Sequence, residues 1–253
     1  MILNPNQIGA REKQVLAGLY LSKFDEQGLT ALGFNSFTEA FNAFGYGLGG
    51  RPASIKNYRD EFDPLFSNPR KGWRNRRRRD YCMTLEQQYR DLSMAEFAAL
   101  VTSFVGHLDD AILMQRDLDV VPALSSFAKR LITGKAAEQY FHAMHTQIAE
   151  FSECDVEDTT MQGCGYDFRL WPKSGDQFRA VEVKGIAEKN GWLSLTDKEH
   201  ESAASLQNRF YLFVVKNFRE KPFHEMHVNP LAGHLNFERK ERVVVQVSWF
   251  AAA

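Results

Sequence analysis

The feature that most constrains this chain is a charged β-hairpin between a predicted helix and an apolar strand. Residues 179–184 largely alternate apolar and charged side chains, and they follow a polar turn at residues 172–175. Alternation of this kind indicates a strand, and the turn indicates that this strand is the second of a hairpin. Because residues two apart share one face of a strand, Glu182 and Lys184 are expected to point the same way, with valines packed on the opposite face.

Three charged groups are expected to meet on this hairpin. Asp167 lies on its first strand and can face Glu182 across the ladder, beside Lys184. Unpaired charges are costly to bury, so the grouping favours a bound divalent cation. The two carboxylates would hold a hard metal through oxygen, and the lysine would orient or activate a water beside it.

An Asp, a spacer and Glu-x-Lys on a hairpin resemble the signature of the PD-(D/E)xK nuclease superfamily. The x position is apolar here, as is usual there, whereas Tyr166 stands where the superfamily often has proline. A helix from Gly134, the hairpin, a helix at about 197–206 and a strand at 210–215 follow in an order similar to the nuclease core. The order is most similar to the subgroup that shares the C-terminal domain of the plant protein NO VEIN, often attached to restriction systems. The resemblance covers roughly the last half of the chain.

The resemblance implies roles for particular residues. Asp167, Glu182 and the backbone carbonyl of Val183 would bind Mg²⁺, and Lys184 would position or deprotonate the attacking water. Glu138, on the helix that precedes the hairpin, matches the position where many members carry a further acidic residue that reaches the metal. The fold implied is an α/β restriction-endonuclease-like core with a central mixed sheet.

Charge is distributed unevenly along the 253 residues, although the net charge is only -1. Residues 1–90 carry 14 Lys and Arg against 9 Asp and Glu, whereas the remainder carries 17 against 23. A basic first part suits phosphates, and an acidic second part suits a metal site. The three cysteines lack metal-ligand spacing and fit reduced thiols in a cytoplasmic protein. No apolar run approaches the roughly 20 residues that cross a bilayer, so no membrane partner is expected.

The first part of the chain predicts three short helices, at about 12–24, 37–44 and 52–62. Their arrangement resembles a helix-turn-helix or winged-helix unit, in which the third helix enters the major groove and reads base edges. A solvated face in a three-helix packing unit is an equally open interpretation. The candidate DNA-reading residues at the third helix are Arg51, Ser54, Lys56, Asn57 and Arg59.

The densest charge cluster is residues 70–79, called here the basic segment. It holds seven cations in ten residues, beside Gly72 and Trp73. Basic runs are often solvated loops, but beside a nuclease site contact with DNA phosphates is the favoured interpretation. The candidate phosphate-binding residues are Arg70, Lys71, Arg74, Arg76, Arg77, Arg78 and Arg79.

The predicted organisation is α+β. A mainly helical DNA-recognition region spans residues 1–115, a connecting helix spans 116–133, and the nuclease domain spans 134–253. Within that domain, residues 223–227 contain His-x-x-His without a third zinc ligand, so they are interpreted as a loop or a late DNA contact. A final strand is expected at 241–250.

The function expected is that of a Mg²⁺-dependent, site-specific endodeoxyribonuclease that cleaves double-stranded DNA in a type II restriction-modification system. Its partners would be duplex DNA and a cognate methyltransferase that acts on the same site, and a homodimer would place two active sites on the two strands. Three alternatives stay open. They are a DNA repair or recombination nuclease, a DNA-binding protein with an inactive nuclease fold, and a nuclease that cuts RNA.

Overall fold

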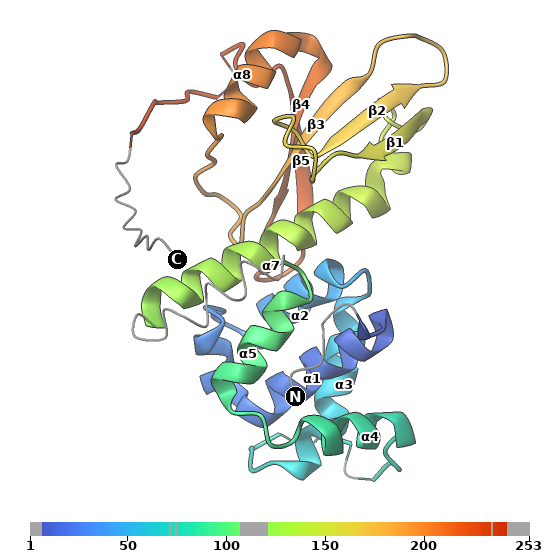
Figure 1. The fold of residues 1–253 in the computed structure, drawn as a ribbon, viewed down its shortest axis with the longest axis vertical. Helices are drawn as coiled ribbons and strands as arrows, with labels where there is room; N and C mark the ends of the chain where they lie inside the picture. The colour runs from blue at the N-terminus through green and yellow to red at the C-terminus, as the bar shows by residue number, and fades with distance from the viewer. Residues whose placement is uncertain (1–6, 71, 74, 107–120, 234, 242–253) are drawn as a thin grey trace, which may run out of the picture.

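The structure is a computed structural model that describes residues 7–70, 72–73, 75–106, 121–233 and 235–241 (Figure 1). The chain is α+β, with a helical region followed by a mixed sheet, as predicted. The helices of the first region are α1 (Ala10–Ala31), α2 (Phe37–Gly47), α3 (Pro52–Phe62), α4 (Asp80–Tyr89) and α5 (Met94–Ser103). None of the helices in these ranges is long and apolar enough to cross a membrane.

The three predicted N-terminal helices are present; the first two are longer than expected, and the third has the expected bounds. Ser36 caps α2 by accepting a hydrogen bond from the Glu39 N–H at 3.2 Å, and Pro52 opens α3. In α1 the backbone breaks at Asp25 (φ 50°, ψ −134°) and the helix then resumes. Their buried side chains form one aromatic-rich core that includes Tyr20, Phe44, Phe62 and Phe97. The similarity to a helix-turn-helix unit stays a prediction.

The sheet has five strands in the order β1-β2-β3-β4-β5. The strands are β1 (Cys154–Asp158), β2 (Phe168–Pro172), β3 (Arg179–Gly185), β4 (Phe210–Lys216) and β5 (Phe223–Val228). Strands β3 and β4 pair in parallel through the crossover helix α8 (Asp197–Leu206), and the other pairs are antiparallel. The predicted hairpin is β2 and β3. The prediction of a loop at 223–227 was wrong, because those residues form edge strand β5; nearly all of the expected strand at 241–250 lies outside the described residues.

A single long helix, α7 (Val121–Met144), joins the two regions (Figure 1). Its first half contributes Ala128 and Ile132 to the helical core, and its second half contributes Ala137 and Phe141 to the core beneath the sheet. The expected connecting helix and the expected first helix of the nuclease domain are therefore one element, and the boundary placed at 133/134 falls inside it. No loop separates the regions there.

Polar contacts add to this junction. The Asn42 side-chain amide on α2 donates to the backbone carbonyls of Phe218 at 2.7 Å and Glu220 at 3.1 Å, in the loop after β4. Lys129 on α7 pairs with the buried Glu39 of α2 at 2.6 Å. Because these groups are tied across the junction, the helical region is held in one orientation relative to the sheet.

The two faces of the sheet are covered differently. Val181 and Val183 pack in the cluster that contains the α7 residues Ala136 and Phe141, as the alternation predicted. Ala180 packs with Ala203 of α8 on the opposite face. The even-numbered side chains of β3, including Glu182 and Lys184, therefore face α8.

Close packing of α7 on the end of β3 requires the glycine that follows Lys184. A Cβ at Gly185 would lie 2.8 Å from the Thr133 carbonyl oxygen and 3.2 Å from the Ala137 Cβ. Gly185→Ala is expected to lower the free energy of unfolding by about 1–3 kcal/mol, because the helix must move away from the strand. Thermal unfolding measures the change.

The matched control for this variant is Gly134→Ala on the same helix. A Cβ at Gly134 meets nothing within 4 Å, so the substitution should be neutral or stabilising by up to about 1 kcal/mol. Equal stability of the Gly185→Ala variant and wild type would contradict the tight helix–strand contact.

Candidate active site

Asp167 and Glu182 lie opposite each other across the hairpin. The ladder begins at Phe168, which pairs with Val181, and Asp167 just before it is close enough to Glu182 for its charge to act on that carboxyl. The backbone N–H of Asp167 donates to the Val181 carbonyl at 3.0 Å, and its Oδ2 accepts from the Val183 N–H at 2.8 Å. The expected juxtaposition is present, and a backbone hydrogen bond fixes the Asp167 carboxylate.

Lys184 lies between two carboxylates. Its Nζ is 2.6 Å from Glu182 Oε1 and 2.7 Å from Glu199 Oε2. Glu199 comes from the first turn of α8, where its carboxylate also accepts from the Thr196 N–H at 3.0 Å and completes a capping box. Sequence reasoning missed Glu199 as a site residue, although the Thr-x-x-Glu pattern at 196–199 is a local signal for the start of that helix.

Burial and like charge govern the ionisation of the site. Burial raises the pKa of Glu182, and the charge of Asp167 raises it further, against the opposing effect of Lys184. Burial likewise raises the pKa of Asp167, which the hydrogen bond from Val183 opposes and the charge of Glu138 reinforces. For Lys184, burial disfavours the cation, but Glu182 and Glu199 outweigh it and raise the pKa above its usual value. Burial and like charge therefore disfavour the ionised forms of Asp167 and Glu182, whereas the two glutamates favour the cationic form of Lys184.

These donors fit a hard divalent cation. Asp167, Glu182 and the Val183 carbonyl offer oxygen atoms only, as Mg²⁺ prefers, and positive charge beside them would relieve the repulsion between two buried carboxylates. Across the described ranges, no group of three or more His, Cys, Asp or Glu side chains is arranged to hold a metal. The candidate set is accordingly two carboxylates and a backbone carbonyl.

Glu138 lies beside the hairpin, where the resemblance implied an acidic residue. Together with Asp167 it lines an open pocket of about 460 Å³ between the helical region and the sheet. Lys135, one turn earlier on α7, pairs with Glu138 at 2.8 Å, and Arg130 also lines the pocket. Two cations therefore flank the approach to Asp167, which suits an anionic substrate.

The candidate DNA-reading residues of α3 differ in exposure. Arg51, Lys56 and Asn57 are exposed, and Ser54 is half-buried. Arg59 is buried and pairs with Asp60 at 2.7 Å and with Asp63 at 3.6 Å. The assignment of Arg59 to DNA is therefore corrected, because its guanidinium is held inside the helical region.

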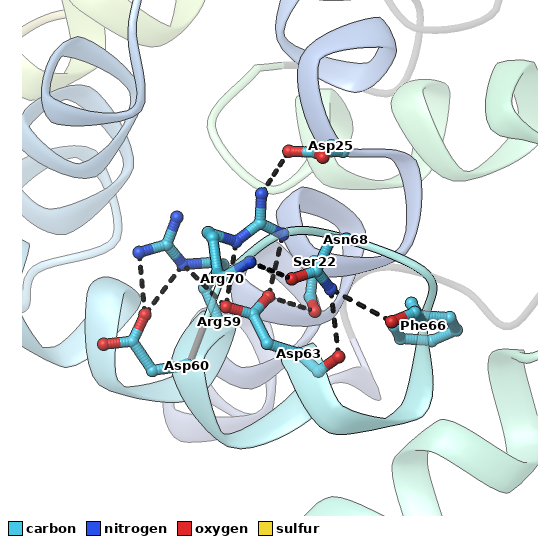
Figure 2. Close-up of polar contacts among 8 residues, drawn as sticks. All are labelled: Ser22, Asp25, Arg59, Asp60, Asp63, Phe66, Asn68 and Arg70. Atoms are coloured by element: carbon cyan, nitrogen blue, oxygen red, sulfur yellow. Dashed lines mark hydrogen bonds and ion pairs between the residues drawn. The ribbon is translucent and has the colours of Figure 1, made fainter. Parts of the chain in front are cut away.

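The start of the basic segment is tied to a buried carboxylate, Asp63, which is 1% exposed (Figure 2). Asp63 accepts hydrogen bonds from Ser22 at 2.7 Å and from Arg70 at 2.8 Å and 2.9 Å. Arg70 also pairs with Asp25, beside the break in α1. Arg70 therefore fixes the basic segment to α1 and to the end of α3, and we no longer count it among the cations that are free to bind phosphate.

The other arginines of the basic segment also differ in exposure and in their partners. Arg79 pairs with Glu61, whose side chain is fully buried, whereas Arg77 is 87% exposed and pairs with Asp80 at 3.2 Å. Arg76 is exposed and lies over the Trp73 ring, and Arg78 is half-buried, with no hydrogen-bond partner for its Nε among the described residues. Lys71 and Arg74 lie outside the described residues.

The basic segment is not beside the hairpin, contrary to expectation. It leads into α4, which lies at the end of the long axis opposite the sheet (Figure 1). The helical core therefore separates the basic segment from Asp167. A DNA molecule that touched both would have to run along the length of the protein.

Two arginines of the basic segment are expected to behave differently. Arg79→Ala should lower the free energy of unfolding by about 3 kcal/mol, because it leaves the buried Glu61 carboxylate without its cation. Arg77→Ala should leave stability within about 0.5 kcal/mol of wild type and weaken DNA binding at low salt. Chemical denaturation and DNA-binding titrations measure both effects. Equal destabilisation by the two substitutions would contradict this division.

The fold and the hairpin define an α+β protein with a carboxylate-lysine site on a mixed sheet. Residues 135–228 match the family described as Protein NO VEIN, C-terminal. The matched segment runs from α7 to the end of β5 and contains Glu138, Asp167, Glu182 and Lys184. No curated protein and no solved structure matches the chain.

Proposed function

We propose that this chain is a Mg²⁺-dependent endonuclease that hydrolyses phosphodiester bonds of double-stranded DNA at specific sites. The observation that carries the proposal is the hairpin, which sets Asp167 opposite Glu182 and places Lys184 on the same face. The order α7-β1-β2-β3-α8-β4, which resembles the PD-(D/E)xK core, and the family match at residues 135–228 support it.

Asp167, Glu182 and the Val183 carbonyl would hold the metal. When bound, Mg²⁺ supplies positive charge that stabilises the charge developing on the phosphate. Glu182 and Glu199 raise the pKa of Lys184, which favours its cationic form. Its role is to orient the attacking water and to offset phosphate charge, while Glu199 and Glu182 hold its amino group in place.

Recognition belongs to the helical region in this proposal. Arg51, Lys56 and Asn57 on α3 are exposed, and Arg76 and Arg77 extend the positive surface at the far end of the molecule. A DNA-recognition region held rigidly against a nuclease domain suits a restriction enzyme. In the cytoplasm such an enzyme would work with a methyltransferase that protects the same site. Two copies of the chain would cut both strands.

A substrate panel tests this assignment. Purified protein with Mg²⁺ is incubated with unmethylated and methylated duplex DNA, flapped DNA, DNA ends and RNA. Discrete fragments from unmethylated duplex alone are expected. Preferential cutting of flaps or ends would favour a repair nuclease, preference for RNA would favour an RNA-processing enzyme, and either result would overturn the restriction assignment.

A further inference from the structure

The surface between α3 and the basic segment is hollowed into an open pocket of about 930 Å³, roughly twice the volume of the pocket at Asp167. Its lining residues include Asn57, Arg70, Gly72, Trp73, Asn75 and Arg76. Neither the candidate active site nor the family match, which begins at residue 135, includes any of them. The pocket is thus a separate feature of the helical region.

Contacts with the rest of the helical region hold the basic segment in place at three points along its length. At its start, Arg70 is tied to Asp63, as Figure 2 shows. In its middle, the Trp73 N–H donates to the Asp60 carbonyl at 2.8 Å, and Gly72 adopts a left-handed φ of 52° against Asp63. Beyond it, Arg79 is paired with the buried Glu61. Because these anchors are within the protein, the pocket is formed before any ligand arrives.

The side chains that line the pocket are of the kinds that bind an unstacked base. The Arg76 guanidinium lies 5.1 Å above the centre of the Trp73 ring, and bases stack both on indole rings and on guanidinium planes. The amides of Asn57 and Asn75 can each donate and accept, as recognition of a base edge requires. Arg76 pairs with no carboxylate in the described part of the chain, so its charge is available to a phosphate.

The volume of the pocket indicates what size of ligand it can accept. Pockets of about 300–1,000 Å³ enclose single small molecules, so the space suits one nucleotide rather than a stretch of duplex. Lys56 and Arg77, which are next in sequence to the lining residues Asn57 and Arg76, are exposed and suit the phosphates on either side of that nucleotide. Aromatic, amide and cationic groups together match a nucleotide better than they match an apolar partner.

We propose that this pocket binds one unstacked base of a DNA strand, stacked at Trp73 and Arg76 and contacted at its edge by Asn57. The proposal rests on the proposed function only in taking DNA as the partner. It assigns to the helical region a base-reading site that acts on an unpaired or extruded nucleotide.

Binding of the full-length protein to fluorescent single-stranded oligonucleotides, in EDTA so that nothing is cut, tests the pocket. Each oligonucleotide is compared with a copy that carries abasic positions and so keeps its phosphates. Wild type is expected to bind the intact strand at least about tenfold more tightly than the abasic strand. Trp73→Leu should remove most of that difference, and Asn57→Ala should reduce it.

The matched control is Trp192→Leu, since Trp192 is 98% exposed and lies outside the pocket. It should bind both strands as wild type does. Asn57 is exposed on α3, so its substitution tests the pocket even where loss of Trp73 disturbs folding. Equal binding of intact and abasic strands by wild type, or an Asn57→Ala variant that discriminates fully, would overturn the proposal. Cutting is not measured, so a protein that binds bases without hydrolysing DNA keeps this site and loses only the nuclease assignment.

Discussion

Lys184→Ala is expected to reduce Mg²⁺-dependent DNA cleavage at least about a hundredfold while DNA binding persists. The amino group of Lys184 is held by Glu182 at 2.6 Å and Glu199 at 2.7 Å, on the same strand face as Glu182. The substitution removes the amino group that would orient the water. DNA binding should persist because the proposed DNA-recognition residues on α3 lie elsewhere. Asp167→Ala and Glu182→Ala should also abolish cleavage, through loss of the metal.

The matched control is Lys189→Ala. Lys189 follows the same strand, is 65% exposed and pairs with Glu220 away from the site. Single-turnover cleavage of a plasmid, beside a binding titration, separates the chemical step from association. A Lys184→Ala protein that cuts at the wild-type rate would contradict the assignment, and so would loss of cleavage in both lysine variants.

Glu182→Gln is expected to stabilise the metal-free protein by about 1 kcal/mol, or about 2–4 °C in melting temperature, while abolishing cleavage. Glu182 is 3% exposed, and burial and Asp167 both disfavour its ionised form. Glutamine keeps the volume and removes the charge, and Lys184 keeps Glu199 as its partner. The buried Glu182 carboxyl therefore lowers the stability of the metal-free protein, and in the proposed site it is a ligand for the cation.

The direction of the pH dependence follows from the same shifts. Glu182 has a folded pKa above its unfolded value, so its destabilising effect is fully present above the folded pKa. The effect shrinks as pH falls through the folded pKa and disappears below the unfolded pKa. Metal-free wild type should therefore gain stability on mild acidification, and Glu182→Gln should gain less. Mg²⁺ should stabilise wild type at alkaline pH and leave the variant unchanged.

Calorimetry across this pH range, with and without Mg²⁺, measures these differences. The control is Glu188→Gln, because Glu188 is 43% exposed and makes a surface pair with Arg219. Surface pairs contribute about 0–1 kcal/mol, so its melting temperature should change little. A Glu182→Gln protein that melts below wild type would contradict the strained-carboxylate account.

The hairpin was predictable because its signals are local. Alternation fixed which residues of β3 share a face, and the register then brought Asp167 opposite Glu182. The helix predicted at about 197–206 has the bounds of α8, and in the structure Thr196 and Glu199 form a capping box at its start. Local periodicity and turn chemistry carry this information within about ten residues.

The parts that sequence reasoning missed depend on contacts between distant residues. No sequence pattern near Arg79 predicts that its partner is Glu61, which lies 18 residues earlier. Likewise, Arg70 pairs with Asp25, which lies 45 residues earlier. The run of cations was therefore interpreted as free phosphate contacts, although Arg70 and Arg79 pair with the buried carboxylates of Asp63 and Glu61. The unbroken α7 was missed for a related reason, because Gly134 resembled a helix start.

The most direct measurement is incubation of the purified protein with unmethylated phage DNA in Mg²⁺ or in EDTA, followed by sequencing of the fragment ends. We expect discrete fragments in Mg²⁺ with one sequence at every cut, and intact DNA in EDTA. Intact DNA in both conditions, with salt-sensitive binding retained, would contradict an active nuclease and leave a DNA-binding protein. A smear would contradict site specificity.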